Sequence, residues 1–296
     1  MPPSNTILSD RPRRSALYLP ASNARALEKS RSLKADVVIL DLEDAVAPEA
    51  KLLARDAAAA AVRQGGFGRR EVVIRVNGLD TPWGSEDLRA AASARPDAIL
   101  LPKVEDPETV LKASAVIGEA GAMSALWLMM ETPRAMLAAT EIAGAGGRLT
   151  CFVMGSNDLL KELQAPFRPG RPALQTALGL TVLAGRANGL CLLDGVYNAI
   201  ADLMGFEAEC REGRDLGFDG KTLIHPTQIE PCNRVFSPDS DDVARARAII
   251  AAFAAPEALQ KGVVQIEGRM AERLHLTEAR RLVALAERIA SADAET

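Results

Sequence analysis

The sequence predicts an α/β fold, a (β/α)8 TIM barrel with a C-terminal helical lid extension, and three observations lead to this fold class. Eight short apolar runs alternate with alanine-rich helical stretches up to residue 235. The runs are almost continuously apolar, which is typical of parallel strands buried on both faces. Eight alternations fit a barrel, which typically takes about 250 residues. An open doubly wound sheet remains the alternative, because alternation alone does not reveal whether the sheet closes.

The elements follow in chain order. The expected strands are the short apolar runs Ala16–Leu19, Val37–Leu42, Val72–Val76, Ala98–Leu101, Leu126–Met130, Thr150–Met154, Leu190–Leu193 and Lys221–Ile224. The expected helices lie between them, at Ala24–Lys34, Glu49–Gln64, Glu86–Ala94, Pro107–Glu119, Pro133–Ala143, Pro172–Asn188 and Glu209–Leu216. Several of these helices begin at a proline, whose fixed φ and missing N–H suit a first turn.

The pattern changes after Pro231. We expect residues 1–235 to form the catalytic barrel and residues 236–296 to form a lid appendage that is not a separately folded domain. Helices are expected there at Asp241–Ala254 and Thr277–Ser291, and residues 262–268 enclose one short strand.

Composition excludes several classes of protein. Of the 296 residues, 48% are hydrophobic and 25% charged, which is ordinary for a globular protein, and the net charge of −4 gives no basic surplus for nucleic acid. No apolar run approaches the ~18 residues of a membrane span, and the N-terminal apolar stretch is too short for a signal peptide, which predicts a cytoplasmic protein. The two histidines exclude a three-histidine zinc site, and the four cysteines form no CxxC pair. A metal here should therefore be a hard cation held by carboxylates, with Mg²⁺ as the first candidate.

Polar residues stand where the expected strands end, which in a parallel barrel is the mouth of the active site. They are Glu43, Asp44, Arg75, Asn77, Lys103, Glu131, Asp158, Asp194 and His225. A carboxylate just after a strand is often only a helix cap, and this alternative applies to Asp44 and Asp158. It suits Glu131 less well, because Thr132 is the better cap. An arginine inside a strand, such as Arg75, needs a carboxylate partner, which a catalytic site supplies.

These residues carry a resemblance that runs in order along nearly the whole chain. The segments are RSALYLP (Arg14–Pro20), DLEDAV (Asp41–Val46), RVNG (Arg75–Gly78), MET (Met130–Thr132), GSNDL (Gly155–Leu159) and LGFDGKTLIHP (Leu216–Pro226). Together they resemble the citrate lyase β-subunit-like, or HpcH/HpaI aldolase, family, which includes malyl-CoA and citramalyl-CoA lyases. RVNGLDTPWG at Arg75–Gly84, with Phe167–Pro169 and Asp194–Asn198, is more similar to the branch that contains malyl-CoA thioesterase.

The resemblance implies a TIM barrel with a lid, assembled as a homotrimer or a dimer of trimers, that binds Mg²⁺ (with Mn²⁺ as a substitute) and an acyl-CoA. By this resemblance Glu131 and Asp158 are the metal ligands, Arg75 binds the carbonyl or enolate oxygen, and Glu43 and Asp44 position metal-bound waters. The resemblance also implies that the substrate carboxylate is bound by the backbone amides of Gly155, Ser156, Asn157 and Asp158. By the same resemblance, Tyr18 and Lys29 contact coenzyme A. The family often has a basic residue at the position of Asn23, and Arg25 is the candidate to replace it.

The lid departs from the pattern of the lyases. They carry a Gly-x-Met-Ile-Asp segment whose aspartate is an acid/base in a neighbouring subunit, and here the segment is Gly268-Arg-Met-Ala-Glu272. Glu272 keeps a carboxylate but adds a methylene, and a misplacement of about 1 Å can matter greatly in catalysis. The alternative is that Glu272 is a solvated acid at the start of a helix.

The sequence therefore predicts a Mg²⁺-dependent carbon–carbon lyase that cleaves a 3-hydroxyacyl-CoA into a 2-oxo acid and an acyl-CoA. Two alternatives stay open, a (3S)-malyl-CoA thioesterase on the same site and a carrier-dependent citrate lyase β subunit. The sequence does not choose among malyl, methylmalyl, citramalyl and citryl substrates, because the acyl pocket depends on packing.

Overall fold

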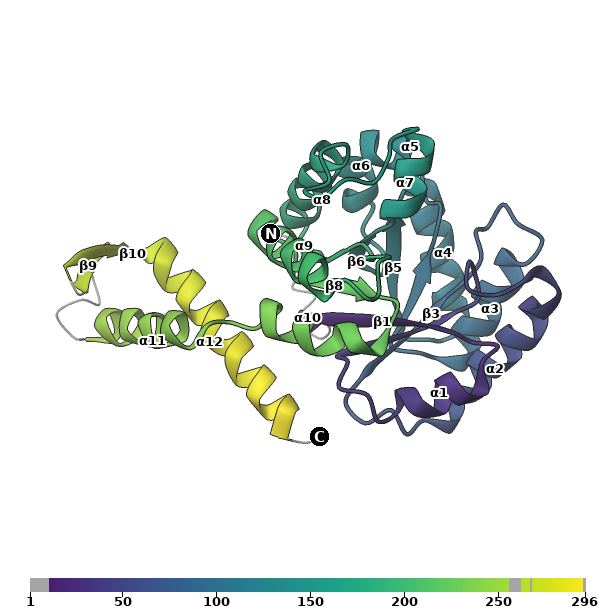
Figure 1. Ribbon diagram of the computed structural model, residues 1–296, viewed down its shortest axis with the longest axis horizontal. Coiled ribbons are helices and arrows are strands. Elements are labelled where there is room, and N and C mark those ends of the chain that lie inside the picture. The colour runs from purple at the N-terminus through teal and green to yellow at the C-terminus, as the bar shows by residue number, and fades with distance from the viewer. Residues whose placement is uncertain (1–10, 256–261, 267, 295–296) are drawn as a thin grey trace. The chain divides into compact units, whose positions relative to one another are not determined.

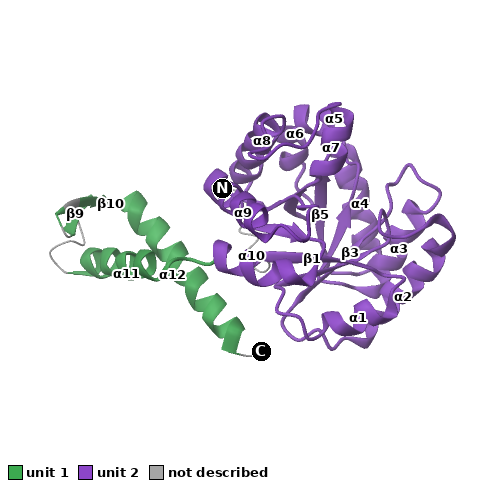
Figure 2. Ribbon diagram, in the orientation of Figure 1, with its two compact units in different colours: residues 1–12, 237–296 green, residues 13–236 purple. Residues whose placement is uncertain are grey.

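The computed structural model describes residues 11–255, 262–266 and 268–294 of the chain (Figure 1). The described residues divide into two compact units, Arg13–Phe236 and a second made of residues 11–12 and the described part of Ser237–Thr296 (Figure 2). Within the described ranges, no helix is both long enough and apolar enough to cross a membrane.

The first unit is a closed barrel of eight parallel strands in sequential order. The strands are β1 (Ser15–Pro20), β2 (Val37–Asp41), β3 (Glu71–Arg75), β4 (Ala98–Leu101), β5 (Ala125–Met130), β6 (Leu149–Met154), β7 (Cys191–Asp194) and β8 (Gly220–Leu223). Strand β1 pairs with β2 on one side and with β8 on the other, which closes the sheet. The predicted fold class is confirmed, and the open sheet is excluded.

Helices follow the strands around the barrel. They are α1 (Ala24–Ser30), α2 (Lys51–Gln64), α3 (Gly84–Ala94), α4 (Pro107–Glu119), α5 (Pro133–Leu137), α6 (Ala139–Gly144), α7 (Ser156–Glu162), α8 (Gln175–Ala187), α9 (Leu203–Leu216) and α10 (Ile229–Phe236), with 3₁₀ turns at Pro48–Ala50 and Pro226–Gln228. The single helix predicted over Pro133–Ala143 is divided at Ala138, whose backbone leaves the helical region. Helix α9 begins six residues before its predicted start, because the Asp202 side chain accepts the Gly205 amide and caps it.

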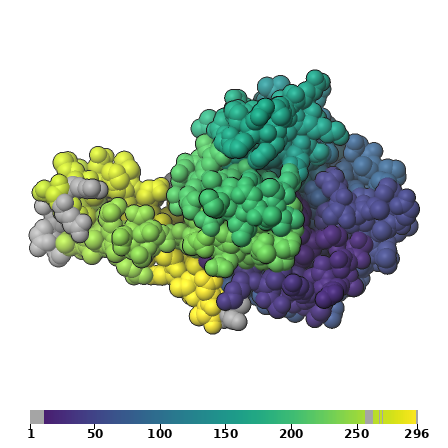
Figure 3. Space-filling view, in the orientation of Figure 1, coloured from purple at the N-terminus to yellow at the C-terminus, as the bar shows by residue number. Residues whose placement is uncertain are grey.

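Strand residues alternate between two environments, as the pleat requires. One set joins the apolar cluster shared with the surrounding helices, and includes Leu17, Leu40, Ile74, Leu101 and Phe152. The other set points into the barrel, where Tyr18, Asp41, Arg75 and Met129 contact one another. Figure 3 shows the outer surface of this unit from the same side as Figure 1.

Two buried ion pairs occupy the end of the barrel where the strands begin, which we call the floor. Arg14 donates through Nε and Nη2 to both carboxylate oxygens of Asp36, at 2.9 and 2.8 Å. Arg13 makes the same two-point contact with Glu71, at 2.6 and 2.8 Å, and its guanidinium lies 4.9 Å from the Trp127 ring centroid. Each of these carboxylates thus meets an arginine through two hydrogen bonds, and Arg69 Nη1 lies a further 4.0 Å from Asp36 Oδ1, an arrangement that suits a stabilising role.

The second unit is built from α11 (Ser240–Ala254), an antiparallel pair β9 (Val263–Ile266) and β10 (Arg269–Glu272), and α12 (Arg273–Ala294). Phe253, Ala271 and Leu276 form one small apolar cluster, and α11 and α12 share another. The sequence predicted only one strand here, and β10 supplies the second. Glu272 is exposed at the end of β10, where its amide donates to His275 Nδ1 at 2.9 Å.

Candidate active site

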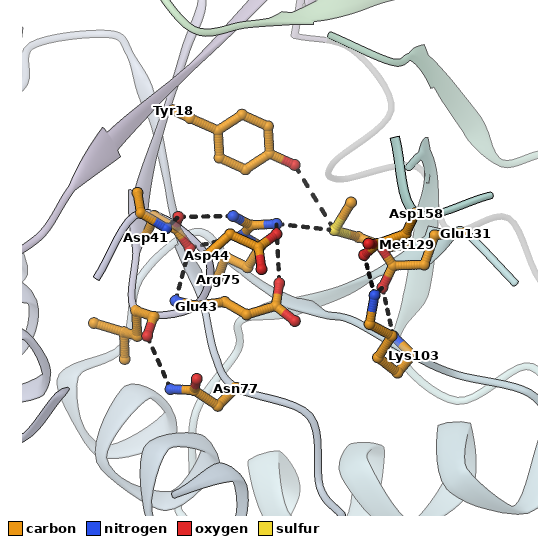
Figure 4. Close-up of polar contacts among 12 residues, drawn as sticks. Tyr18, Asp41, Glu43, Asp44, Arg75, Asn77, Lys103, Met129, Glu131 and Asp158 are labelled. Carbon is orange, nitrogen blue, oxygen red and sulfur yellow. Dashed lines mark hydrogen bonds and ion pairs between the residues drawn. The ribbon is translucent and has the colours of Figure 1, made fainter. Parts of the chain in front are cut away.

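Arg75 is the centre of the barrel mouth, the end where the strands finish (Figure 4). Its Nε and Nη2 donate to the two carboxylate oxygens of Asp41, at 2.6 and 2.7 Å. Its third nitrogen, Nη1, lies 2.9 Å from Glu43 Oε2, 3.3 Å from Asp44 Oδ2 and 3.5 Å from Met129 Sδ. One edge of the guanidinium is therefore used inside the protein, and Nη1 is the nitrogen that faces the other side chains of the mouth.

Tyr18 covers one face of Arg75. Its ring centroid lies 4.6 Å from the guanidinium carbon, a cation–π contact, and its hydroxyl lies 3.9 Å from Met129 Sδ. Burial raises the pKa of the Tyr18 hydroxyl above its usual range. The residue assigned to coenzyme A from the sequence thus also holds the plane of Arg75.

Glu43 carries the most perturbed carboxyl of the mouth. Burial raises its pKa to about 8, against the opposing effect of Arg75. Its Oε2 is buried and, although 2.9 Å from Arg75 Nη1, it lacks hydrogen-bond geometry to any donor. A buried carboxylate oxygen without a donor is costly, and a bound ligand or water that satisfies it would be stabilising.

The loop that carries Glu43 is held from beneath by Lys51. The Lys51 ammonium donates to the carbonyl oxygens of Leu42 (2.8 Å) and Glu43 (2.7 Å), and to Asn77 Oδ1 (2.8 Å). Asn77 in turn donates to Leu42 O at 2.9 Å and to Asp87 Oδ2 at 2.6 Å. Asn77, one of the polar strand-end residues, therefore braces the loop.

Glu131 and Asp158 are brought together across the mouth by Lys103 (Figure 4). The Lys103 ammonium pairs with Asp158 Oδ2 and lies 3.5 Å from Glu131 Oε1, which also accepts the Lys103 amide at 2.8 Å. Lys103 has a positive φ of 54°, an uncommon conformation for a residue with a side chain. Burial raises the pKa of Glu131 to about 6, and Lys103 opposes that rise. Lys103 was not among the residues given a role from the sequence.

The segment expected to bind a carboxylate lies at the start of α7. The Gly155 amide donates to Met130 O at 3.0 Å, so this amide is already used within the protein. The amides that follow belong to the first turn of a helix, which leaves them without partners in the helix. Ser156 Oγ is buried and has no hydrogen-bond partner, and the Asn157 side chain pairs with Asn198 on the loop after β7.

Other sequence-assigned residues lie elsewhere. Arg25 and Lys29 are exposed on α1, whose first turn is capped by Asn23. Glu272 belongs to the second unit. Asp194 is fully buried between Arg171 Nη1 (2.7 Å) and Lys221 Nζ (2.9 Å), in an ion-pair network on the helix side of β7.

His225 caps a short turn. Its ring nitrogen accepts the Thr227 amide at the start of the 3₁₀ turn. This contact gives His225 a structural role as a cap.

The donor set suits Mg²⁺. Across the described part of the chain, no group of three or more histidine, cysteine or acidic side chains is arranged to enclose a metal. Mg²⁺ needs no such cage, because it is commonly bound through one or two carboxylates while it keeps several waters. Glu131 and Asp158 supply two carboxylates that already share one cationic group, the Lys103 ammonium. The unpartnered Glu43 oxygen and the nearby Asp44 could orient water.

Comparisons with known proteins identify the family of the chain. Residues 14–226 match the family model described as HpcH/HpaI aldolase/citrate lyase. The chain is 51% identical over 280 residues to a (3S)-malyl-CoA thioesterase of Cereibacter sphaeroides, covering 95% of this chain and 96% of the relative. It is 31% identical over 285 residues to the citrate lyase subunit beta of Leuconostoc mesenteroides subsp. cremoris, covering 94% of each.

A solved structure adds ligands to the comparison. CitE from Mycobacterium tuberculosis, in complex with magnesium, acetoacetate and coenzyme A, matches with a TM-score of 0.75 and 29% identity, covering 92% of this chain and 97% of that one. Magnesium and coenzyme A, the two ligands expected from the sequence, are thus present in a structural relative. The prediction of an enzyme is confirmed by the named activity of the relatives, and the chain belongs to the HpcH/HpaI aldolase/citrate lyase family.

Proposed function

We propose that this chain hydrolyses the thioester of a malyl-CoA-type substrate with the help of Mg²⁺. The observation that carries the proposal is 51% identity over 95% of the chain to a malyl-CoA thioesterase. The mouth supports it chemically, because one arginine nitrogen and two metal-binding carboxylates converge there. In the reaction, water adds to the thioester carbonyl carbon, the carbon–sulfur bond breaks, and a carboxylic acid and the coenzyme A thiol leave.

The residues of the mouth divide the work. Arg75 binds the thioester carbonyl oxygen through Nη1 and stabilises the negative charge that grows on it, which is usually the largest single contribution to catalysis. Glu131 and Asp158 would hold Mg²⁺, which when bound would supply Lewis-acid polarisation of substrate oxygens. Glu43 and Asp44 orient the attacking water beside Arg75.

The rest of the substrate is held by neighbouring elements. The first-turn amides of α7, at Ser156, Asn157 and Asp158, meet the substrate carboxylate, because helix N-termini favour anions. Tyr18, Arg25 and Lys29 meet coenzyme A. The two basic side chains of α1 are exposed and match the charge of its phosphates.

Carbon–carbon cleavage is the second candidate, favoured by the similarity to citrate lyase subunit beta. It needs an acid that protonates the enolate carbon after the bond breaks, and Glu272 keeps a carboxylate for that purpose. If Glu272 serves a neighbouring subunit of a homotrimer, an inactive Glu272→Ala protein and an inactive Glu131→Gln protein should regain partial activity when mixed as hybrids. Hybrids without recovery would assign Glu272 to its own subunit, and a fully active Glu272→Ala protein would exclude it from the reaction.

One product analysis separates the candidates. Purified protein with Mg²⁺ and malyl-CoA should release free thiol and malate in equal amounts, without glyoxylate. Formation of glyoxylate and acetyl-CoA would instead show that the protein is a carbon–carbon lyase. Activity confined to an acyl-carrier-protein thioester, with none on any free CoA ester, would identify a carrier-dependent subunit and overturn the proposal.

A further inference from the structure

We infer that Asp41 is a positioning residue of this site, which fixes both the orientation of Arg75 and the loop that carries Glu43 and Asp44. The experiments below that measure turnover rest on the proposed function, whereas the measurement of the Arg75 resonance does not. Asp41 was assigned no role from the sequence, and it touches the mouth only through other residues.

Four short hydrogen bonds converge on the Asp41 carboxylate. It accepts Arg75 Nε at 2.6 Å and Nη2 at 2.7 Å, and the backbone amides of Glu43 and Ala45 at 2.9 and 3.0 Å. The residue is fully buried at the end of β2. A carboxylate offers about four lone-pair sites, so this one is saturated and has no capacity left for substrate.

This arrangement determines which part of Arg75 faces the mouth. Asp41 occupies the Nε–Nη2 edge, the side-on fork that would otherwise pair with a planar carboxylate. Tyr18 lies over the plane of the guanidinium, which restrains its tilt. What remains are the two N–H groups of Nη1, next to Glu43, and the second N–H of Nη2, so the Nη1 end of Arg75 is the part directed towards the other side chains of the mouth.

Charge balance alone does not account for Asp41. Glu43 and Asp44 also lie within ion-pair distance of Arg75, at 2.9 and 3.3 Å, and would neutralise it without Asp41. They contact only Nη1, whereas Asp41 holds the opposite edge and the loop amides. The distinct contribution of Asp41 is therefore to fix the orientation of the Arg75 guanidinium and of the loop that carries Glu43.

The floor provides a matched control at the opposite end of β2. Asp36, just before β2, accepts Nε and Nη2 of Arg14 at 2.9 and 2.8 Å and the Arg14 amide at 2.8 Å. It is buried like Asp41, but its partners do not reach the mouth. Asp36→Asn therefore removes a similar ion pair without altering the proposed site.

The test compares Asp41→Asn with Asp36→Asn. Asp41→Asn should lower kcat by about 100-fold with KM changed less than about threefold, because a misplacement of about 1 Å of a reacting group has that effect. Asp36→Asn should lower the melting temperature and leave the kcat of the folded protein unchanged. Wild-type kcat in Asp41→Asn, or an equal kcat loss in both variants, would overturn the inference.

A double-mutant cycle then asks whether Asp41 acts through Arg75. If it does, the loss of kcat in the double variant Asp41→Asn, Arg75→Lys should be smaller than the product of the two single losses, and what Asp41→Asn still adds to Arg75→Lys would come from the loop of Glu43 and Asp44. Effects that multiply would mean that Asp41 acts independently of Arg75. If Asp41→Asn does not fold, Asp41→Glu keeps the charge, displaces the carboxylate, and should show the same non-additive loss.

A readout without turnover keeps this inference distinct from the proposed function. The ¹⁵N–¹H resonance of Arg75 Nε, identified by its loss in Arg75→Lys, should shift and exchange faster with solvent in Asp41→Asn but not in Asp36→Asn. An inactive wild type with this shift present would refute the proposed function and leave the positioning of Arg75 by Asp41 intact. An unchanged resonance would refute the positioning.

Discussion

The two ends of the barrel use the same kinds of charged residue in opposite ways. At the floor, Arg13 and Arg14 each meet one carboxylate through two hydrogen bonds, and each of these four side chains is less than 10% exposed. At the mouth, the ion pairs join two cations, Arg75 and Lys103, to five carboxylates, Asp41, Glu43, Asp44, Glu131 and Asp158, and a third cation, Lys51, lies beneath the Glu43 loop.

The excess of carboxylates makes the mouth costly to maintain without a ligand. Burial raises the pKa of Glu43 to about 8 and that of Glu131 to about 6, so the charged forms of both are disfavoured there. A divalent cation would relieve this imbalance. The comparison indicates that the floor stabilises the fold, whereas the mouth retains unbalanced charge for binding.

The largest expected effect comes from removing one of the two carboxylates that we propose bind the metal. Glu131→Gln or Asp158→Asn should reduce turnover to below about 0.1% of wild type, since Lewis-acid stabilisation supplies several kcal/mol and each 1.36 kcal/mol is tenfold in rate. The fold should persist, because glutamine relieves the cost of a buried charge at position 131. EDTA should abolish the turnover of the wild type, and added Mg²⁺ or Mn²⁺ should restore it.

The floor gives the contrast for this prediction. Glu71→Gln leaves Arg13 buried with a weaker partner, so it should lower the free energy of unfolding, measured by denaturant titration, by about 3 kcal/mol. Its turnover per folded molecule should stay at the wild-type level. Near-normal turnover in Glu131→Gln, or a selective loss of turnover in Glu71→Gln, would contradict the assignment of catalysis to the mouth and of stability to the floor.

The next effect concerns the two arginines. Arg75→Lys keeps the charge but loses the planar fork, and kcat should fall by about 100- to 1,000-fold, with a smaller rise in KM. Arg14→Lys should instead lower stability by about 1–3 kcal/mol and leave kcat unchanged. If Arg75→Lys altered only KM, Arg75 would serve ground-state binding alone.

The sequence predicted the fold well because the barrel depends on local signals. Almost continuously apolar runs located all eight strands, and Pro107 marked the start of α4 correctly. Helix α7 was missed because it is short and its start at Gly155 has no side-chain cap. Strand β10 was missed because its residues lack a strand pattern and pair only with β9.

The site was predicted less completely. The strand-end rule brings together Glu43, Asp44, Arg75, Glu131 and Asp158, as the structure does. Asp41 escaped notice although the signal existed, since it is one charged residue inside the apolar run Val37–Leu42. The contact of Lys103 with two carboxylates depends on the path of a long side chain, which spacing along the chain does not reveal.

Lys103 allows a smaller, sharper test of the mouth. If its ammonium occupies the place of a cation between Glu131 and Asp158, Lys103→Met should bind Mn²⁺ about 3- to 10-fold more tightly, a change of about 1 kcal/mol. Electron paramagnetic resonance of free Mn²⁺ measures this without turnover. Lys112→Met, which removes an exposed lysine paired with Glu108, is the control and should leave the affinity unchanged. Weaker binding in Lys103→Met would mean that Lys103 orients the ligands instead of competing with the metal.

The smallest effect is a pH dependence of stability that should belong to the mouth. In the unfolded chain Glu43 loses its proton near pH 4.5, whereas in the folded protein burial raises its pKa to about 8. Between these values the folded state holds the extra proton, so this group makes the wild type less stable as pH rises. Glu43→Gln removes this pH dependence of stability, because glutamine does not titrate.

The experiment compares melting temperatures in EDTA. Between pH 5 and 8.5 the melting temperature of Glu43→Gln should rise relative to that of the wild type, by about 2–4 °C for each kcal/mol relieved. Glu71→Gln should lower the melting temperature across the same range, because it breaks a satisfied pair. A Glu43→Gln curve parallel to that of the wild type would show that the Glu43 carboxyl is not strained by burial, and the contrast between the ends would then rest on Glu131 alone.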